Sequence, residues 1–196
     1  MAGPYPYTID NGAGERLTFS EVRSDEQCEY QEATNSVSPG SGPPMHVHHL
    51  QEESLTVESG TMGWQRHGED EQIARSGETV TFAPGEMHRF WNAGDDELVC
   101  SGYVRPPDNI EYFLTKIFES TRANGGKRPR MFDAAYLLSR YRPEFGMAEI
   151  PAPVQRFVFP IVVGIGRLFG LGKRFADAPE PVSRRPERPV FADVTK

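Results

Sequence analysis

The 196-residue chain is poor in cysteine, with only Cys28 and Cys100, which lie far apart. A disulfide framework generally needs a larger even set, so we expect two reduced, buried thiols. The N-terminal stretch lacks the basic segment and apolar core of a secretory signal. No apolar run reaches the roughly 18 residues that a membrane-spanning helix needs. These absences predict a soluble, cytoplasmic protein.

Positive charge is scarce in the first half of the chain. Residues 1–109 hold 6 Lys and Arg against 19 Asp and Glu, whereas residues 110–196 hold 15 against 9. The net charge of −7 argues against a general nucleic-acid-binding protein, which would be basic. The asymmetry indicates either two modules with different surfaces, or halves that attract each other or a neighbouring subunit.

Long helical patterns are absent before residue 105. From about residue 15 to 104, runs of four to seven strand-forming residues alternate with clusters of Gly, Pro and Asp. Many short strands separated by such turn signals predict a β-sandwich or a small barrel.

The pattern changes to a helical one after residue 109. Apolar residues at helical spacing predict one helix over 110–125 and a second over 130–142. The apolar stretch 154–169 predicts a third helix, weakened or kinked by Pro160. Residues 176–196 are rich in Pro and charge, which is typical of a flexible tail. We therefore expect a β-domain over 1–109 with an N-terminal strand, a helical extension over 110–175 and a tail over 176–196.

Histidines and carboxylates gather in the stretch PPMHVHHLQEES, residues 43–54. Alternate residues of a strand point to the same side, so His46 and His48 project together while His49 points away. Glu53 begins the next alternating run and can face the same interior. Such donors suit Fe, Mn, Ni, Cu, Co or Zn. A His-x-His pair alone is weak support, and a solvated polar loop is the alternative.

The spacing around these residues resembles the first motif of the cupin family. That motif is a glycine, five residues, His-x-His, three or four residues, a glutamate, six residues and a glycine. It is matched from Gly40 to Gly60 through His46, His48 and Glu53.

The second cupin motif is also matched. It is a glycine, five residues, Pro-x-Gly-x-x-His and an asparagine four positions later. The match runs from Gly77 to Asn92 through His88, with Ala83 where the family usually has proline. Together the two matches place the resemblance over roughly residues 15–105.

The resemblance implies a mainly β protein, with a cupin-type jelly-roll β-barrel followed by the helical extension. It implies that His46, His48, Glu53 and His88 bind a divalent transition metal and leave coordination positions open, as in catalytic sites. Iron is favoured, with Mn, Ni and Zn as alternatives. Glu52 also meets the spacing from His48, but only Glu53 leaves six residues before the motif glycine.

Similarity to quercetinase-like cupins implies a metal-dependent dioxygenase, an oxidoreductase that acts on a small, partly apolar aromatic or enolisable substrate. Glu53 would then be a catalytic base as well as a ligand. The alternatives are a non-redox isomerase, cyclase or lyase, and a non-enzymatic binding or sensor protein. By strand phase, five apolar or aromatic side chains are expected to line the barrel, either around the metal or as plain core: Met62, Trp64, Phe82, Phe90 and Tyr103.

The expected partners are a small-molecule substrate and a second copy of the chain, without nucleic acid. The apolar stripe over 154–174 could fold back on the barrel, form a dimer contact or lie on a membrane surface beside its basic residues. Its shortness and Pro160 favour the first two.

Overall fold

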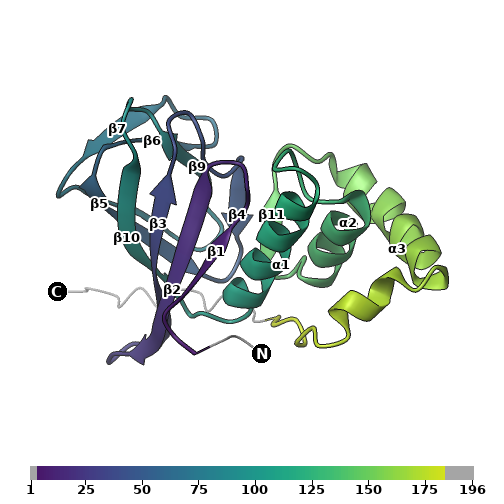
Figure 1. Ribbon diagram of the computed structural model, residues 1–196. Coiled ribbons are helices and arrows are strands. Elements are labelled where there is room, and N and C mark those ends of the chain that lie inside the picture. The colour runs from purple at the N-terminus through teal and green to yellow at the C-terminus, as the bar shows by residue number, and fades with distance from the viewer. Residues whose placement is uncertain (1–3, 184–196) are drawn as a thin grey trace, which may run out of the picture.

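The protein consists of a β-barrel of two sheets joined to a group of helices (Figure 1). The computed structural model describes residues 4–183. The strands that precede the helices are β1 (Tyr7–Asp10), β2 (Glu15–Ser24), β3 (Glu29–Val37), β4 (His46–His48), β5 (Glu52–Ser59), β6 (Thr61–Arg66), β7 (Gln72–Arg75), β8 (Thr79–Phe82), β9 (Met87–Asn92) and β10 (Leu98–Arg105). The later elements are α1 (Ile110–Ala123), α2 (Met131–Arg140), β11 (Phe145–Met147), the π-helical turn η1 (Val154–Val158), α3 (Phe159–Leu168) and the 3₁₀ turn η2 (Leu171–Phe175).

All strand pairs are antiparallel, and the two sheets have the orders β1-β2-β3-β10-β5-β8 and β11-β4-β9-β6-β7. Strands that are neighbours in a sheet are mostly distant in sequence, as in a jelly roll. The prediction of a mainly β protein with a jelly-roll barrel and a helical extension is confirmed.

Alternation along the strands decides which side chains enter the barrel. In β2, Glu15, Leu17 and Phe19 are buried, while the residues between them are more exposed. The turn between β5 and β6 depends on Gly60, whose φ is +87° and whose missing Cβ would lie 2.9 Å from a backbone oxygen of Glu97. A side chain there would strain the backbone and collide with the neighbouring strand.

The predicted stripe on α1 is confirmed, because Ile110, Phe113 and Phe118 are buried. Phe118 packs against Leu17 and Phe19 of β2, so α1 covers the barrel sheet on that side (Figure 1). Residues from α1, α2, β11 and α3 form a second apolar core outside the barrel.

Strand β11 lies within the predicted helical extension but pairs with β4 of the barrel. Phe145 is opposite His48, and Met147 is opposite His46. This pairing was not expected from the sequence. It attaches the helices directly to the strand that carries two of the predicted metal ligands.

The irregularity predicted around Pro160 is present. The helical backbone runs continuously over residues 152–168, and its hydrogen-bond pattern changes from π-helical to α-helical just before Pro160, which lies in the first turn of α3. The π-helical turn η1 comes immediately before it. Within residues 4–183, no helix is long and apolar enough to cross a membrane.

The last described residues have no regular secondary structure but are hydrogen-bonded to the segment between α2 and β11. The Tyr141 hydroxyl donates to the Pro179 carbonyl at 3.0 Å, and the Val182 N–H donates to Glu144 at 2.9 Å. The rest of the predicted tail, residues 184–196, lies outside the described residues. Both cysteines are free thiols as predicted, with Cys100 buried but Cys28 only partly so.

Close packing of α3 on α2 depends on Gly166. A Cβ at that position would overlap the Phe132 ring, whereas a Cβ at Gly164 would meet nothing within 4 Å. We predict that Gly166→Ala lowers the free energy of unfolding by about 1–3 kcal/mol, through overpacking. Gly164→Ala should leave it unchanged or raise it by up to about 1 kcal/mol, because alanine favours helix. Urea unfolding of both variants checks this, and equal effects would contradict the packing.

Candidate metal centre

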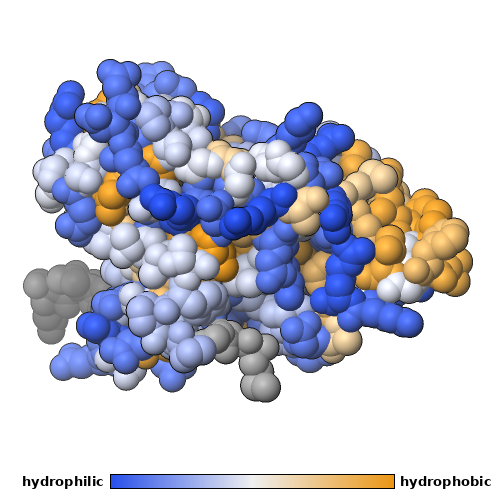
Figure 2. All heavy atoms as spheres, in the orientation of Figure 1, coloured by the Kyte–Doolittle hydropathy of each residue, from blue (hydrophilic) through white to orange (hydrophobic). Residues whose placement is uncertain are grey.

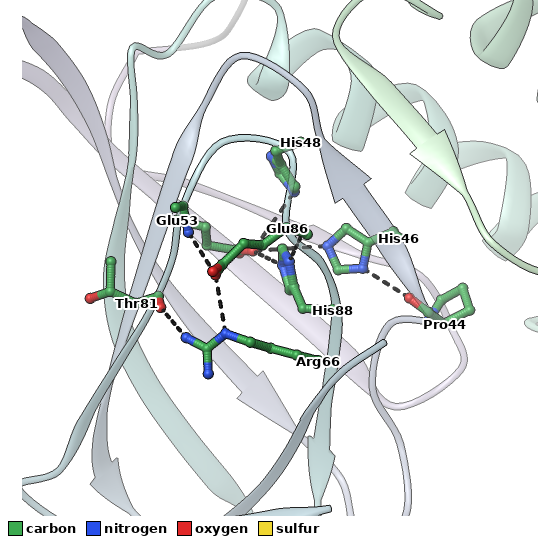
Figure 3. Close-up of polar contacts among 9 residues, drawn as sticks. Pro44, His46, His48, Glu53, Arg66, Thr81, Glu86 and His88 are labelled. Atoms are coloured by element: carbon green, nitrogen blue, oxygen red, sulfur yellow. Dashed lines mark hydrogen bonds and ion pairs between the residues drawn. The ribbon is translucent and has the colours of Figure 1, made fainter. Parts of the chain in front are cut away.

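Strands from both sheets bring together the four residues predicted to bind metal. His46 and His48 lie on β4, Glu53 on β5 and His88 on β9, with His46 and His88 opposite each other in register. The side chains point toward one another inside the barrel (Figure 3). One ligand atom from each lies within 4.8 Å of those of the others.

The Glu53 carboxylate lies at the centre of the three imidazoles. Its Oε2 is 2.8 Å from His88 Nε2, 3.7 Å from His48 Nε2 and 3.9 Å from His46 Nε2. His48 and His88 are buried, and the other two side chains are nearly so. Three nitrogens and one oxygen converging in a small buried volume form a donor set that could hold a divalent transition metal.

Hydrogen bonds to backbone carbonyls fix two of the rings. Nδ1 of His46 lies 2.9 Å from the Pro44 carbonyl, and Nδ1 of His88 lies 2.8 Å from the Glu86 carbonyl. A carbonyl only accepts, so each Nδ1 carries the proton and donates it. The Nε2 atoms of these two rings therefore face the centre, which is how metal-binding histidines are usually oriented. Without a metal, His88 Nε2 hydrogen-bonds to Glu53 instead.

Packing against aromatic rings holds two of the histidines. His88 stacks on Phe82 with ring centroids 3.8 Å apart and an interplanar angle of 4°. His48 meets the edge of Phe145, at 5.5 Å and 83°. Because Phe145 belongs to β11, the helical extension helps to orient a ligand and separates it from solvent.

Electrostatics in the cluster favour the metal-binding forms of Glu53 and His48, whereas His46 must lose a proton to bind metal. Burial raises the pKa of Glu53, but its interactions with His46 and His88 outweigh burial and hold that pKa well below its usual range. Burial lowers the pKa of His48 to about 3, so its ring is neutral at neutral pH. The pKa of His46 is lowered by burial but raised on balance by Glu53. A metal ion would supply the positive charge that this His46 proton supplies to Glu53.

The polar residues next to the ligands in the first motif do not join the cluster. Glu52 accepts a hydrogen bond from the Tyr103 hydroxyl at 2.9 Å, outside the cluster. His49 is exposed, and so is His67 in the turn after β6. Gln51 was expected near Glu52 on the outside or beside the ligands, and it is fully buried, with its amide donating to Asp108.

Four of the five side chains expected inside the barrel lie there. Phe82 stacks on His88, Phe90 lines the cavity, and Met62 is fully buried with Trp64 packed against the same core. Tyr103 borders the cavity but its ring does not point into the barrel as expected. It pairs with Ser54 on β5, out of phase with Glu53, and its ring lies beside Tyr30 on the outer face.

The turn before β9 is held by Glu86. Its carboxylate accepts hydrogen bonds from Arg66 Nε at 3.1 Å and from the Ala83 N–H at 3.0 Å (Figure 3). Arg66 also donates to the Thr81 carbonyl at 2.8 Å. Glu86 therefore positions the turn that delivers His88.

The cluster faces a cavity of about 1260 Å³ that extends from the barrel interior to the helices. Its wall is mostly apolar and includes Phe19, Phe113 and Phe159. Two buried polar side chains, Glu15 and Asn35, also line it. Asn35 Oδ1 accepts no hydrogen bond within the described residues.

Glu15 is the functional candidate that sequence reasoning missed. Burial raises its pKa to about 7, although the amides of Asn11 and Asn35 and the charge on His46 oppose this. Asn11 Nδ2 donates to Glu15 Oε2 at 2.8 Å. The available signal was its phase, because Glu15 alternates with Leu17 and so points into the barrel.

Comparison with known proteins finds similarity over the part of the chain that forms the barrel. A family model described as "Cupin domain" matches residues 35–101. The probable oxidoreductase virH of Hypocrea virens is 29% identical over 68 residues, which are 34% of this chain and 31% of that protein. The oxidoreductase iacF of Pestalotiopsis fici is 27% identical over 90 residues, which are 45% and 44% of the two chains. The match spans less than half the length of both relatives.

Solved structures resemble the barrel only loosely. KdgF from Halomonas sp. is 16% identical, with 50% of this chain and 86% of that one covered and a TM-score of 0.43. A double-stranded β-helix protein from Klebsiella pneumoniae is 18% identical, with 54% and 81% covered and a TM-score of 0.41. With TM-scores this low, neither structure supports a functional assignment.

Removal of one ligand tests the metal centre. We predict that His88→Ala lowers the affinity for Fe(II), Co(II) or Zn(II) by more than the roughly 10–100-fold that loss of a residue supporting a ligand costs. His49→Ala is the control, because His49 follows the ligand His48 in sequence but lies outside the cluster. Metal titration by calorimetry measures both affinities. Equal affinities in the two variants would contradict the assignment.

The raised pKa of Glu15 leads to a separate prediction, on how the free energy of unfolding of the metal-free protein depends on pH. Its folded pKa of about 7 lies above the ordinary value of 4.5. The stability that it contributes is therefore fully present below pH 4.5 and is lost as the pH rises through about 7. Relative to Glu15→Gln, the wild type should lose up to about 3 kcal/mol of unfolding free energy over that window. Parallel pH curves for the two proteins would show that Glu15 does not titrate in this way.

Proposed function

Because residues 35–101 form a cupin domain, we propose that this protein is a metal-dependent oxygenase acting on a small, partly apolar organic substrate. The observation that carries the proposal is the convergence of three imidazoles and one carboxylate on the wall of a large apolar cavity. The relatives named as oxidoreductases agree with a redox reaction.

We assign the metal to the Nε2 atoms of His46, His48 and His88 and to the Glu53 carboxylate. Four protein donors leave coordination positions open on a metal that prefers five or six ligands. Iron is the metal that we favour, with Mn, Ni and Zn as alternatives. When bound, such a metal acts as a Lewis acid and, if it is redox-active, as a route for electrons between substrate and O2.

The cavity supports an aromatic or enolisable substrate. Its apolar walls would hold a ring or a short carbon skeleton, and its few buried polar groups would fix the orientation. Asn35 Oδ1, buried without a donor in the described part of the chain, is suited to accept a hydrogen bond from a substrate hydroxyl. A substrate lacking that hydroxyl would leave the oxygen unpaired and would bind less well.

Two carboxyl groups in the cavity differ in proton affinity. We propose that Glu53, ionised because its pKa is well below its usual range, holds the metal. It would accept the substrate's enolic or phenolic proton only where it is weakly coordinated, because a lowered pKa makes a weaker base. Glu15, whose pKa burial raises to about 7, is matched to proton exchange near neutral pH and is close enough to feel the charge on His46. Glu15 would thus hold or exchange a proton farther from the metal.

An oxygen-uptake assay tests the proposal. Protein is stripped of metal, loaded anaerobically with Fe(II), Mn(II) or Ni(II), and mixed with flavonols, β-diketones and catechols in an oxygen-electrode cell. We expect uptake that needs both metal and substrate, that His46→Ala abolishes, and that Glu52→Gln leaves within about twofold of wild type, because Glu52 lies outside the cluster.

Two results would contradict the oxygenase. The first is no metal-dependent uptake with any member of the panel. The second is turnover under nitrogen with Zn(II) or Ni(II), which would instead support isomerase, cyclase or lyase chemistry at the same ligands. If the protein binds metal and a panel compound but converts that compound neither in the presence of O2 nor under nitrogen, it is a binding or sensor protein.

A further inference from the structure

The outer face of η1 and α3 exposes a continuous apolar surface. Figure 2 shows it as an orange area over the end of the molecule farthest from the barrel, where Figure 1 places α3. Its members are large apolar side chains that lie 47–86% exposed: Phe157, Val158, Ile161, Ile165, Leu168 and Phe169. We call these six residues the α3 apolar face. Few monomeric proteins leave so many large apolar side chains of one helix in water.

The opposite side of the same helix is packed, so the α3 apolar face is held in place. Phe159 is buried, and Val162 and Val163 pack on the helical core. Gly166 lies against the Phe132 ring of α2. The exposed residues recur three or four positions apart, which puts them on one side of the helix. Folding back on the barrel, one of the sequence-based expectations, does not cover this face within residues 4–183.

The segment that carries the face has basic residues and no acidic ones. Residues 150–176 contain no Asp or Glu but contain Arg156, Arg167, Lys173 and Arg174, all exposed. Arg174 pairs with Asp133 at 2.9 Å. The other three form no ion pair with the described residues. Arg156 and Arg167 instead lie over the rings of Phe157 and Tyr136.

We propose that the α3 apolar face docks onto the surface of an anionic lipid membrane. A helix that combines exposed Phe and Leu on one side with flanking Lys and Arg lies in the interface, with its apolar side chains among the acyl chains. The basic residues then meet lipid phosphates, which attract each cation near the surface. This surface is independent of the metal centre and of the proposed reaction.

Charge favours a membrane over a second copy of the chain as the occupant. In a twofold dimer the same patch meets itself, so Arg156, Arg167 and Lys173 of the two copies would be brought together. No carboxylate of the segment 150–176 would offset them. An anionic lipid surface supplies the complementary charge over the whole face.

Vesicle sedimentation of the full-length protein tests the proposal. We expect binding to mixed phosphatidylcholine–phosphatidylglycerol vesicles, weaker binding to pure phosphatidylcholine, and weakening by added salt. Leu168→Ser should lower the partition coefficient roughly 10-fold or more, because it removes a large side chain from the lipid. Ile73→Ser on β7 is the matched control, since Ile73 is 50% exposed but lies on the barrel. It should have no effect.

Charge variants separate the two parts of the surface. Arg156→Glu and Lys173→Glu should each weaken binding to the anionic vesicles about fivefold or more and leave binding to pure phosphatidylcholine nearly unchanged. Light scattering at the same concentrations reports the oligomeric state. The proposal is wrong if the wild type does not bind anionic vesicles, or if Leu168→Ser and Ile73→Ser bind alike. It is also wrong if Leu168→Ser dissociates a dimer that does not bind vesicles, because the face would then be a contact between copies.

Discussion

The interaction on which the rest of the site depends is that of one buried carboxylate with three imidazoles. An ionised carboxyl inside a barrel is costly unless positive charge and hydrogen bonds surround it. Glu53 obtains these from His46, His48 and His88, which lie on two neighbouring strands of the opposite sheet. The backbone carbonyls of Pro44 and Glu86 orient two of the rings so that their Nε2 atoms face the same point. Three ring nitrogens and one carboxylate oxygen thus converge on one point, which is an arrangement suited to a divalent cation.

The helices complete the site as well as extending the chain. Strand β11 pairs with β4, and Phe145 touches His48, so the extension supports the strand on which two ligands lie. Helix α1 and the start of α3 close the cavity with Phe113 and Phe159. A large, apolar, partly enclosed cavity next to the ligands is what a reaction on an apolar molecule requires. Barrel and helices therefore share one cavity.

Much of the fold and the cluster could be predicted from the sequence because local rules determine them. Period-two alternation and motif spacing place His46, His48 and Glu53 on one side, and helical spacing predicts α1 and α2. Features that depend on tertiary pairing could not be predicted. Strand β11 is three residues long and carries no strand pattern of its own, and Tyr103 was placed inside because its register against β5 was unknown. Glu15 could have been found from its phase with Leu17, but its raised pKa depends on burial by distant residues.

X-ray absorption spectroscopy of the protein loaded with Fe(II) or Co(II) tests the central claim, that these four side chains hold one metal ion. We predict a first shell of nitrogen and oxygen at about 2.0–2.2 Å, with the outer-shell scattering of three imidazoles. In His48→Ala that scattering should fall to two imidazoles. A sulfur shell, which would point to Cys28 or a methionine, or a spectrum without imidazole scattering would contradict the account.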